Sequence, residues 1–505
     1  MTHEIPIADS QSRKALILPG GGMRVAWQAG AVKALHEHGL RYSVADGASG
    51  GTMNLAALLS GISPDELCRR WRALNIRRFI SLRSPVWYLR FPAIGAFGDF
   101  DGIRDTIFPG LGIDVGAIRQ QRDIAASFNL CEFDSKTVMA VAHGAVTLEH
   151  LLAAISLPLA TPAVSIDGKT YTDAVWIQDC NLIEAVRQGA NELWVLWCIA
   201  NTPRYSPHLV EQYVHMIEMS ALGSLHEQFA QLQAINEDIA RGNRPFGQDA
   251  PITVHLIRPE FPIPLDFDLV AGRTNSAELI GFGYRDAMTY LEAMTENGTA
   301  LSPKSTRMQI PPKGVSFREV MSGRITFGQT DPQTGYRDPG AVPVSLNASI
   351  VIRDLDRFIA DPLHPGELTG HLYAPRLGQN PVGWNGRFRL FSPGSDSSVS
   401  EMVYATNYRQ EGRALWFDGR KFVRNGFRPW RVWTETTTLH VKIRPDPESD
   451  EVLAAGILRL NIFQLLTLLS TAQSSGCQTT FEQAKYLLRF FGFFARQIWR
   501  AYFVR

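Results

Sequence analysis

Short apolar runs alternate with helical patterns through residues 1–300. Ala15–Leu18 and Tyr42–Ala48 have the character of strands, and each precedes an amphipathic stretch with helical spacing, Arg24–His38 and Thr52–Leu59. Later strand-like runs are Val138–Ala142, Leu193–Ile199 and Ile252–Ile257, and a longer helical run surrounds His215–Ile239. Short apolar strands separated by helices favour an α/β fold with a mainly parallel sheet that helices flank.

The pattern changes after a segment rich in Pro, Ser, Thr and Gly at residues 296–314, which predicts a linker. Leu439–Arg444 then alternates apolar with basic side chains, as a half-exposed strand does. Similar short runs are Ser345–Ile352, Leu368–Tyr373, Phe388–Phe391 and Ala414–Phe417, with turn signals at Asn385-Gly386, Pro393-Gly394 and Asp418-Gly419. We expect a β-rich antiparallel sheet or barrel that ends in helices over Ala454–Thr471 and Phe481–Phe503.

The predicted organisation is therefore a tail (1–13), an α/β domain (14–295), a linker (296–314) and a β-rich domain (315–505). Charge supports the division, because the net charge of +1 over 505 residues is a cancellation. Residues 301–505 hold 26 Lys and Arg against 17 Asp and Glu, or +9, which leaves 24 against 32, or −8, for residues 1–300. The basic part has the sign that an anionic surface attracts.

The sequence lacks the usual signals for secretion, for a membrane span and for a metal site. The first 14 residues lack the apolar run of a signal peptide, and no stretch of about 18 apolar residues suggests a membrane span. The five cysteines are scattered without a C-x-x-C pair, so no disulfide framework or zinc site is expected. We expect a cytoplasmic protein, with contact to a membrane only at its periphery.

Gly47-Ala48-Ser49-Gly50-Gly51 fits the G-x-S-x-G pattern between a predicted strand and a predicted helix. A nucleophilic serine needs such a sharp turn, because small neighbours let its hydroxyl project above the sheet. The helix that follows adds a positive dipole, which favours developing negative charge. The alternative is an ordinary tight turn.

Pro19-Gly20-Gly21-Gly22-Met23-Arg24 lies between the first predicted strand and its helix. Consecutive glycines there expose backbone N–H groups that could bind an anion or form an oxyanion hole for acyl transfer. A dinucleotide fingerprint would need glycine where Val25 stands, and a P-loop would need Gly-Lys-Ser/Thr. Nucleotide binding is therefore disfavoured.

Together, the GGGxR loop and the G-x-S-x-G motif about 25 residues later resemble the patatin-like phospholipases. A third motif of that family is an aspartate after a hairpin, and Ile166-Asp167-Gly168-Lys169-Thr170-Tyr171-Thr172-Asp173 is similar to it. The preceding Ser156–Pro162 and the later Ile280–Ala287 are also similar, so the resemblance covers about residues 14–295.

The resemblance implies a serine acyl hydrolase with a Ser–Asp dyad, acting on lipid esters without metal, cofactor or nucleic acid. Ser49 would be the nucleophile and Asp173 the general base. The implied oxyanion donors are Gly20, Gly21, Gly22 and Met23, and the supporting residues are Arg24, Gly47 and Gly51. Arg24 would anchor the glycine loop in preference to holding a substrate anion.

Two departures from the family pattern leave a second interpretation open. Ala174-Val175 replaces the family's Gly-Gly or Gly-Ala after the aspartate, and Val25 replaces the last glycine of the loop. The alternative is therefore a catalytically impaired, lipid-binding or scaffold protein that keeps the fold. His143 is expected to be a packing or loop residue, since the family uses no histidine. The aromatic and Arg-rich residues 77–97 form either a mobile cap over the serine or a peripheral helix pair.

Residues 315–505 resemble, more weakly, an accessory region of bacterial proteins related to cholesterol oxidases. The similar segments are Ser316–Gly323, Asp354–Phe358 and Thr436–Val441. No flavin fingerprint accompanies them, so an accessory module that binds lipid or sterol is favoured over an oxidoreductase. In the last predicted helix, the four basic residues Lys485, Arg489, Arg496 and Arg500 share one stripe. This helix would either lie on an anionic membrane or dock its aromatic face on the adjacent sheet.

Overall fold

The computed structural model describes residues 13–79, 81–91, 93–202, 205–248, 250–373, 381–394, 396, 398–410 and 413–504. These residues form two compact units. The N-terminal unit comprises residues up to 29, 38–266 and 290–308, and the C-terminal unit comprises residues 30–37, 267–289 and 309 onward. The expected tail lies outside the described residues except for Arg13. No described helix carries an apolar stretch of the length that crossing a lipid bilayer requires.

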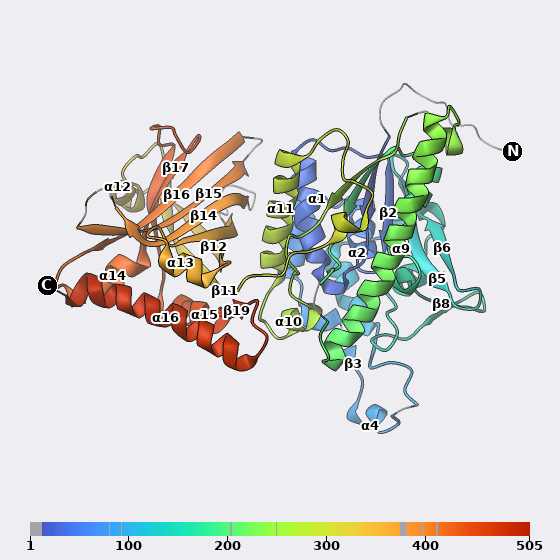
Figure 1. Cartoon of the computed structure of the whole chain (residues 1–505), viewed down its shortest axis with the longest axis horizontal. Helices are drawn as coiled ribbons and strands as arrows, with labels where there is room; N and C mark the ends of the chain where they lie inside the picture. Colours follow the sequence, from blue (N-terminus) through green and yellow to red (C-terminus); the bar gives the residue numbers. More distant parts are fainter. Residues whose placement is uncertain are drawn as a thin grey trace. The chain divides into compact units, whose positions relative to one another are not determined.

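The N-terminal unit is built on an eight-stranded sheet in the order β10-β9-β1-β2-β5-β8-β7, with β6 also paired to β5. The strands from β10 to β5 are parallel, whereas β6, β7 and β8 join by antiparallel pairs. The strand bounds are β1 Lys14–Leu18, β2 Val44–Ala48, β5 Ala125–Glu132, β6 Thr137–Ala142, β7 Val164–Ile166, β8 Lys169–Asp173, β9 Glu192–Leu196 and β10 Thr253–Ile257. The mainly parallel α/β fold is thus confirmed (Figure 1).

Helices cover both faces of this sheet. Apolar residues of α8 and α9 form one core with side chains of β1, β9 and β10, and α9 crosses the sheet in Figure 1. Gly47 points to the opposite face, where a Cβ would lie 2.9 Å from Leu55 of α2. The helices that begin in this part of the chain are α1 Ala26–Glu37, α2 Gly51–Leu59, α3 Pro64–Ala73, α4 Pro85–Tyr88, α5 Phe108–Leu111, α6 Val115–Gln120, α7 Leu148–Ala154, α8 Leu182–Arg187, α9 Leu209–Ala240, α10 Asp266–Val270 and α11 Ser276–Ala293; a small β3–β4 pair spans Ser81–Leu82 and Gly98–Asp99.

The C-terminal unit contains a closed barrel of eight antiparallel strands. Consecutive strands pair from β11 to β18, and β11 pairs with both β12 and β18, which closes the ring. The expected β-rich architecture is thus confirmed as a barrel. Its strands are β11 Gly314–Phe327, β12 Val342–Ile352, β13 Pro365–Tyr373, β14 Val382–Pro393, β15 Val399–Gln410, β16 Arg413–Arg424, β17 Thr438–Arg444 and β18 Ala454–Arg459, and the short β19 (Gln473–Ser475) also pairs with β11.

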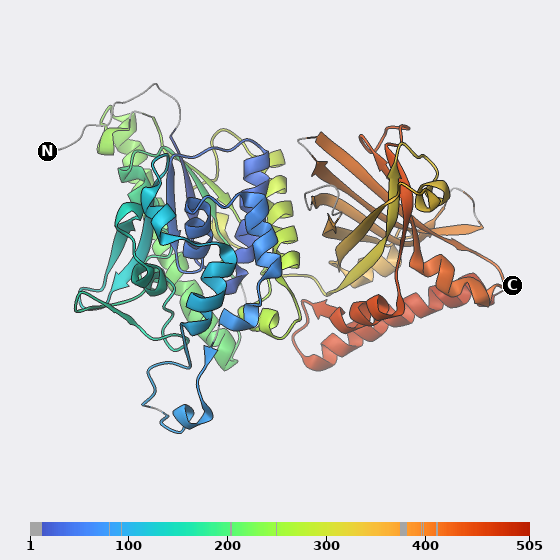
Figure 2. The same cartoon turned by 180° about the vertical axis from the view of Figure 1, so that it is seen from behind.

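Helix α16 runs below the barrel in both views (Figures 1 and 2). Tyr486, Phe490 and Phe493 of α16 are buried in the same core as the inward side chains of the strands. The predicted helix over Phe481–Phe503 is therefore confirmed, with its aromatic face on the barrel. The helices that begin after residue 309 are α12 Pro332–Arg337, α13 Leu355–Ala360, α14 Val432–Thr437, α15 Ile462–Thr471 and α16 Thr480–Phe503.

Three local predictions in this unit are wrong. Asp418-Gly419 lies inside β16, where ion pairs with Arg420 and Arg444 stabilise the buried Asp418. Asn385-Gly386 lies inside β14 and forms a bulge, not a turn, with Asn385 at φ 51°. The helix expected over Ala454–Thr471 is β18 followed by α15, because the first half of the segment closes the barrel.

Candidate active site

Ser49 occupies a strained turn between β2 and α2. Its φ is 46°, in the left-handed region that few non-glycine residues adopt. The turn is tight because Gly51 lies against β1, where a Cβ would come within 1.9 Å of the Leu18 carbonyl oxygen. Backbone strain of this kind persists where the surrounding structure enforces it, and it lifts the Ser49 side chain above the end of the strand.

The glycine loop after β1 packs directly against this turn. A Cβ on Gly20 would lie 2.6 Å from the Ser49 Cβ and 3.0 Å from its Oγ. A Cβ on Gly50 would lie 2.4 Å from the Gly22 carbonyl oxygen. Gly21 and Gly22 have φ of 152° and 59°, and Val25 already lies in the short 3₁₀ turn Gly22–Val25. Glycine is therefore needed in the loop itself but not at position 25.

The four amides of this loop differ in their availability. Both carboxylate oxygens of Asp179 accept from the Gly20 N–H, at 3.0 and 2.9 Å, and Asp266 Oδ1 accepts from the Met23 N–H at 3.1 Å. Within the described part of the chain, the Gly21 and Gly22 N–H groups have no hydrogen-bond partner. Gly21 and Gly22 are thus the amides that can donate to a developing oxyanion.

Asp173 is the last residue of β8 and is almost fully buried. Its Oδ1 accepts from the Val175 N–H at 2.9 Å, whereas its buried Oδ2 forms no hydrogen bond of normal geometry with any described residue. Burial raises the pKa of Asp173 to about 7, although the nearby Ser49 hydroxyl and the Val175 N–H both lower it. Ser49 therefore faces a carboxyl group that titrates close to neutral pH.

The segment around Asp173 needs no glycine. Asp173 caps a 3₁₀ turn over Ala174–Trp176, and neither Ala174 nor Val175 has a positive φ. The Asp173 N–H donates to the Ser156 carbonyl at 3.0 Å, and Ser220 of α9 donates to the Val175 and Trp176 carbonyls. The replacement of the family's glycines at this point is therefore compatible with an ordered turn.

A buried polar network lies below the serine turn on the face of α8 and α9. Asp46 accepts from the Ser127 hydroxyl at 2.6 Å and from the Asn129 amide at 2.7 Å. Asn129 also donates to the Gly47 carbonyl and accepts from Asn181. Burial raises the pKa of Asp46 to about 7, even though the bonds from Ser127 and Asn129 lower it. The network ties the strand that carries Ser49 to its neighbour β5.

Arg24 contacts the glycine loop, and His143 lies elsewhere. The buried Arg24 Nε donates to the Gly21 carbonyl at 3.2 Å and lies 4.0 Å from Asp266 Oδ1, as expected for an anchor. His143 hydrogen-bonds the backbone of Ala126 and Gln121. Ala125 and Ala126 pair with the start of β2, so His143 is at the opposite end of the strand from Ser49.

Exposed apolar side chains lie in two segments that contact the loop after Ser156. Residues 77–97 include Val86, Leu89 and Phe91, which are 69%, 83% and 68% exposed; Ile80 and Pro92 of this segment lie outside the described residues. The segment returns beside the loop after Ser156, because the Phe97 N–H donates to the Leu159 carbonyl at 2.8 Å; the Leu159 side chain is exposed. The N-terminal end of α9 reaches the same loop, where the Tyr213 hydroxyl donates to the Pro158 carbonyl, and it exposes Leu209 and Val210.

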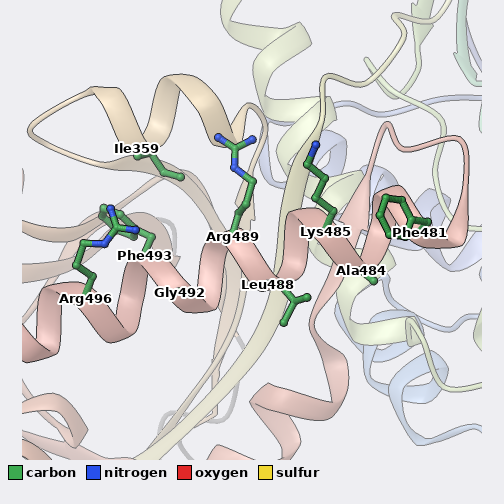
Figure 3. A pocket seen from close by; sticks show the side chains of 9 residues that line it. All are labelled: Ile359, Phe481, Ala484, Lys485, Leu488, Arg489, Gly492, Phe493 and Arg496. Carbon is green, nitrogen blue, oxygen red and sulfur yellow. The ribbon is translucent and has the colours of Figure 1, made fainter.

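In the other unit, the basic stripe of the last helix faces away from the barrel core. Figure 3 shows Lys485, Arg489 and Arg496 projecting from one side of α16, next to Ile359 of α13. These side chains line a groove between α16 and Ile359 of α13. Arg489 forms an ion pair with Asp356, whereas Lys485 and Arg496 have no ion pair with a described residue. The helix thus docks its aromatic face and keeps its basic face outside.

Sequence reasoning missed two acids of the site, Asp179 and Asp266. Asp179 is fully buried, and burial, followed by repulsion from Asp173, raises its pKa well above the ordinary value. The only sequence signal for Asp179 was its position six residues after Asp173, and no pattern marked Asp266, which begins α10. Both accept hydrogen bonds from backbone amides of the glycine loop, which is distant from them in the sequence.

Comparisons with known proteins give a family match and a similar solved structure. The family model of patatin-like phospholipases matches residues 16–186. No curated protein matches the chain. Among solved structures, the chain is similar to VipD from Legionella pneumophila, with 11% identity, coverage of 56% of this chain and 67% of that chain, and a TM-score of 0.32. The part of the chain that matches the model of patatin-like phospholipases holds the glycine loop, Ser49 and Asp173.

Proposed function

We propose that the chain is a serine lipid acyl hydrolase that cleaves carboxylic esters through a Ser49–Asp173 dyad. The observation that carries the proposal is the strained Ser49 turn, which faces the buried Asp173 and abuts a loop with two unoccupied amides. An acid with its pKa near 7 is a better base for a hydroxyl than an ordinary aspartate, because catalytic efficiency is highest when the pKa lies near the working pH.

In this mechanism, Ser49 Oγ attacks the ester carbonyl while its proton passes to Asp173. The carbonyl oxygen becomes an oxyanion that the Gly21 and Gly22 N–H groups stabilise. Collapse of this intermediate releases the alcohol, which takes the proton from Asp173, and leaves an acyl-serine ester. Asp173 then accepts a proton from water as the water oxygen attacks the acyl carbonyl. When this second intermediate collapses, Ser49 Oγ leaves and takes that proton, which releases the carboxylic acid and restores Ser49 and ionised Asp173.

The exposed apolar side chains of residues 86–91, of Leu159 and of the start of α9 support a lipid as the substrate. Val86, Leu89, Phe91, Leu159 and Leu209 are each more than half exposed. Exposed apolar clusters on a protein surface are typical of sites that meet a membrane or another protein. We assign these side chains to contact with acyl chains at a lipid surface, and the basic face of α16 to contact with anionic headgroups.

A fluorophosphonate probe and a panel of lipid esters test the proposal on the full chain. The wild type should be labelled at Ser49 and should hydrolyse at least one ester. Ser49→Ala should lose the label and the activity, whereas Ser135→Ala, at an exposed hairpin position, should keep both. Full esterase activity in Ser49→Ala would refute the dyad. An unlabelled, inactive wild type would instead favour the impaired lipid-binding protein.

A further inference from the structure

A cavity of about 620 Å³ opens between one end of the barrel and helices α14, α15 and α16. This volume is within the range of sites that bind small molecules. Its walls are almost entirely apolar: Phe317, Leu390 and Met402 from the strands, and Leu465 and Phe494 from the helices. All of its lining residues belong to the C-terminal unit, so the cavity is separate from the Ser49 site.

A buried polar group lies in the wall of this apolar cavity. Lys421 donates to Glu319 Oε1 at 2.7 Å and to the Tyr404 hydroxyl at 3.1 Å, and Tyr404 donates to Glu319 Oε2 at 2.8 Å. All three side chains line the cavity and are about 2% exposed. Burial, followed by the nearby Glu319 carboxylate, raises the pKa of Tyr404 well above its ordinary value, so the phenol stays neutral.

This cluster crosses the barrel interior. Glu319 is on β11, between the inward Phe317 and Met321, and Lys421 is on β16, which does not pair with β11. A buried ion pair is often no more stabilising than apolar residues of the same size, because both charges lose their hydration. Its presence in a cavity wall is therefore better explained by recognition of a ligand than by stability.

The hydrogen-bonding capacity that remains identifies the type of ligand. An ammonium group has three protons, and Lys421 uses two of them with described acceptors. A carboxylate has about four acceptor sites, and Glu319 uses two. One hydroxyl group can accept from Lys421 and donate to Glu319, whereas a carboxylate would add an uncompensated negative charge beside Glu319 in an apolar cavity.

The entrance to the cavity is suited to a lipid. Trp430 and Trp499 line the cavity but are 71% and 60% exposed. Helix α15 has no charged residue, and its outer side chains Phe463 and Leu466 are 75% and 55% exposed. Large apolar side chains gathered on an exposed helix face typically mark a surface that meets a lipid or another protein. Here the outer face of α15 provides an apolar path from a lipid surface to the cavity.

We propose that the barrel binds an uncharged long-chain lipid with a hydroxyl group at one end, which hydrogen-bonds the Glu319–Lys421–Tyr404 cluster while its chain fills the apolar cavity. The proposal does not depend on ester hydrolysis. It assigns the C-terminal unit a binding site of its own, and binding there requires a hydroxyl group and a long chain but no ester bond.

Radiolabelled oleyl alcohol and oleate, measured by equilibrium dialysis with the full chain, test this site. We expect one oleyl alcohol per chain, and binding of oleate at least about tenfold weaker. The double variant Glu319→Leu/Lys421→Met removes both charges together, so that neither is left buried alone, and should weaken oleyl alcohol binding about tenfold or more. Ala495→Trp places a large side chain at an exposed position in the cavity wall and should block binding.

Lys442→Met, which changes a charged residue of β17 outside the cavity lining, is the matched control and should bind like the wild type. Esterase activity on a short soluble ester should be the same in all of these variants. The proposal is overturned if oleyl alcohol does not bind, if oleate binds as tightly, or if Ala495→Trp binds as the wild type does. Should the double variant fail to fold, the Ala495→Trp result alone decides.

Discussion

Replacing Asp173 with asparagine should stabilise the chain at alkaline pH and strongly lower its rate of hydrolysis. In the folded chain the pKa of Asp173 is raised from 3.8 to about 7. Folding therefore favours the protonated acid. The stability that the folded chain gains from holding this proton is fully present below pH 3.8 and is lost as pH rises through about 7. The difference of about 3 pKa units corresponds to roughly 4 kcal/mol of free energy of unfolding above pH 7.

Asparagine has nearly the shape of aspartic acid, and its Oδ1 can still accept from the Val175 N–H, so the variant should keep the turn. Asp173→Asn should therefore exceed the wild type in free energy of unfolding by a few kcal/mol at pH 8, and by almost nothing at pH 4. Loss of the charge also relieves repulsion with Asp179, which acts in the same direction.

Urea unfolding at the two pH values measures this difference, with Asp123→Asn as a control at an exposed position that should show no change. A variant no more stable than the wild type at pH 8 would refute the reasoning, as would an equal gain at both pH values. Hydrolysis should fall by about 10² to 10⁴ in the same variant, since the general base is removed.

Four further predictions concern the site and the basic helix. Below pH 7, kcat/KM should fall about tenfold per pH unit because Asp173 must be ionised to accept the Ser49 proton, and a flat profile from pH 5 to 8 would contradict this. Gly20→Ala should lower kcat/KM about 100-fold because its Cβ would displace Ser49 or Asp179, whereas Gly144→Ala, with no atom within 4 Å of the new Cβ, should be neutral in the same assay. Asp266→Ala frees the Met23 amide for the oxyanion and should raise kcat severalfold; a decrease would show that the carboxylate supports the loop. Lys485→Glu/Arg496→Glu should weaken sedimentation with anionic vesicles at least about tenfold at low salt, while Arg337→Glu on α12 should not, and equal binding by all would exclude α16 from membrane contact.

Point substitutions test the membrane contact of α16 better than deletion of the helix would. The periodicity of residues 481–503 predicted a basic amphipathic helix, but it left open whether the aromatic face meets a membrane or the sheet. Phe490 and Phe493 are buried in the barrel core, so removal of the helix would expose that core. Point substitutions on the outer face leave it covered.

Much of the site was predictable because its elements are local. Glycine runs and G-x-S-x-G place a loop and a serine after two successive strands, and parallel strands bring both to one edge of the sheet. The Asp167-Gly168 turn, with φ of 51° and 78°, likewise forms the hairpin that ends at Asp173. The prediction of turns at Asn385 and Asp418 failed because their neighbours in adjacent strands, not their own turn propensity, decide their conformation.

The sequence by itself determined the alternation of strands and helices, the positions of the glycine loop, Ser49 and Asp173, and the split of charge between the two parts of the chain. Only the tertiary structure decided which loop amides are free, because Asp179 and Asp266 reach Gly20 and Met23 across 159 and 243 residues. It also decided that the second half closes into a barrel and that Lys421 meets Glu319, 102 residues away, inside it. The spacing of apolar residues in an element indicates which of its side chains face the core and which face solvent. The partners of a buried charge depend instead on how elements that are distant along the chain pack together.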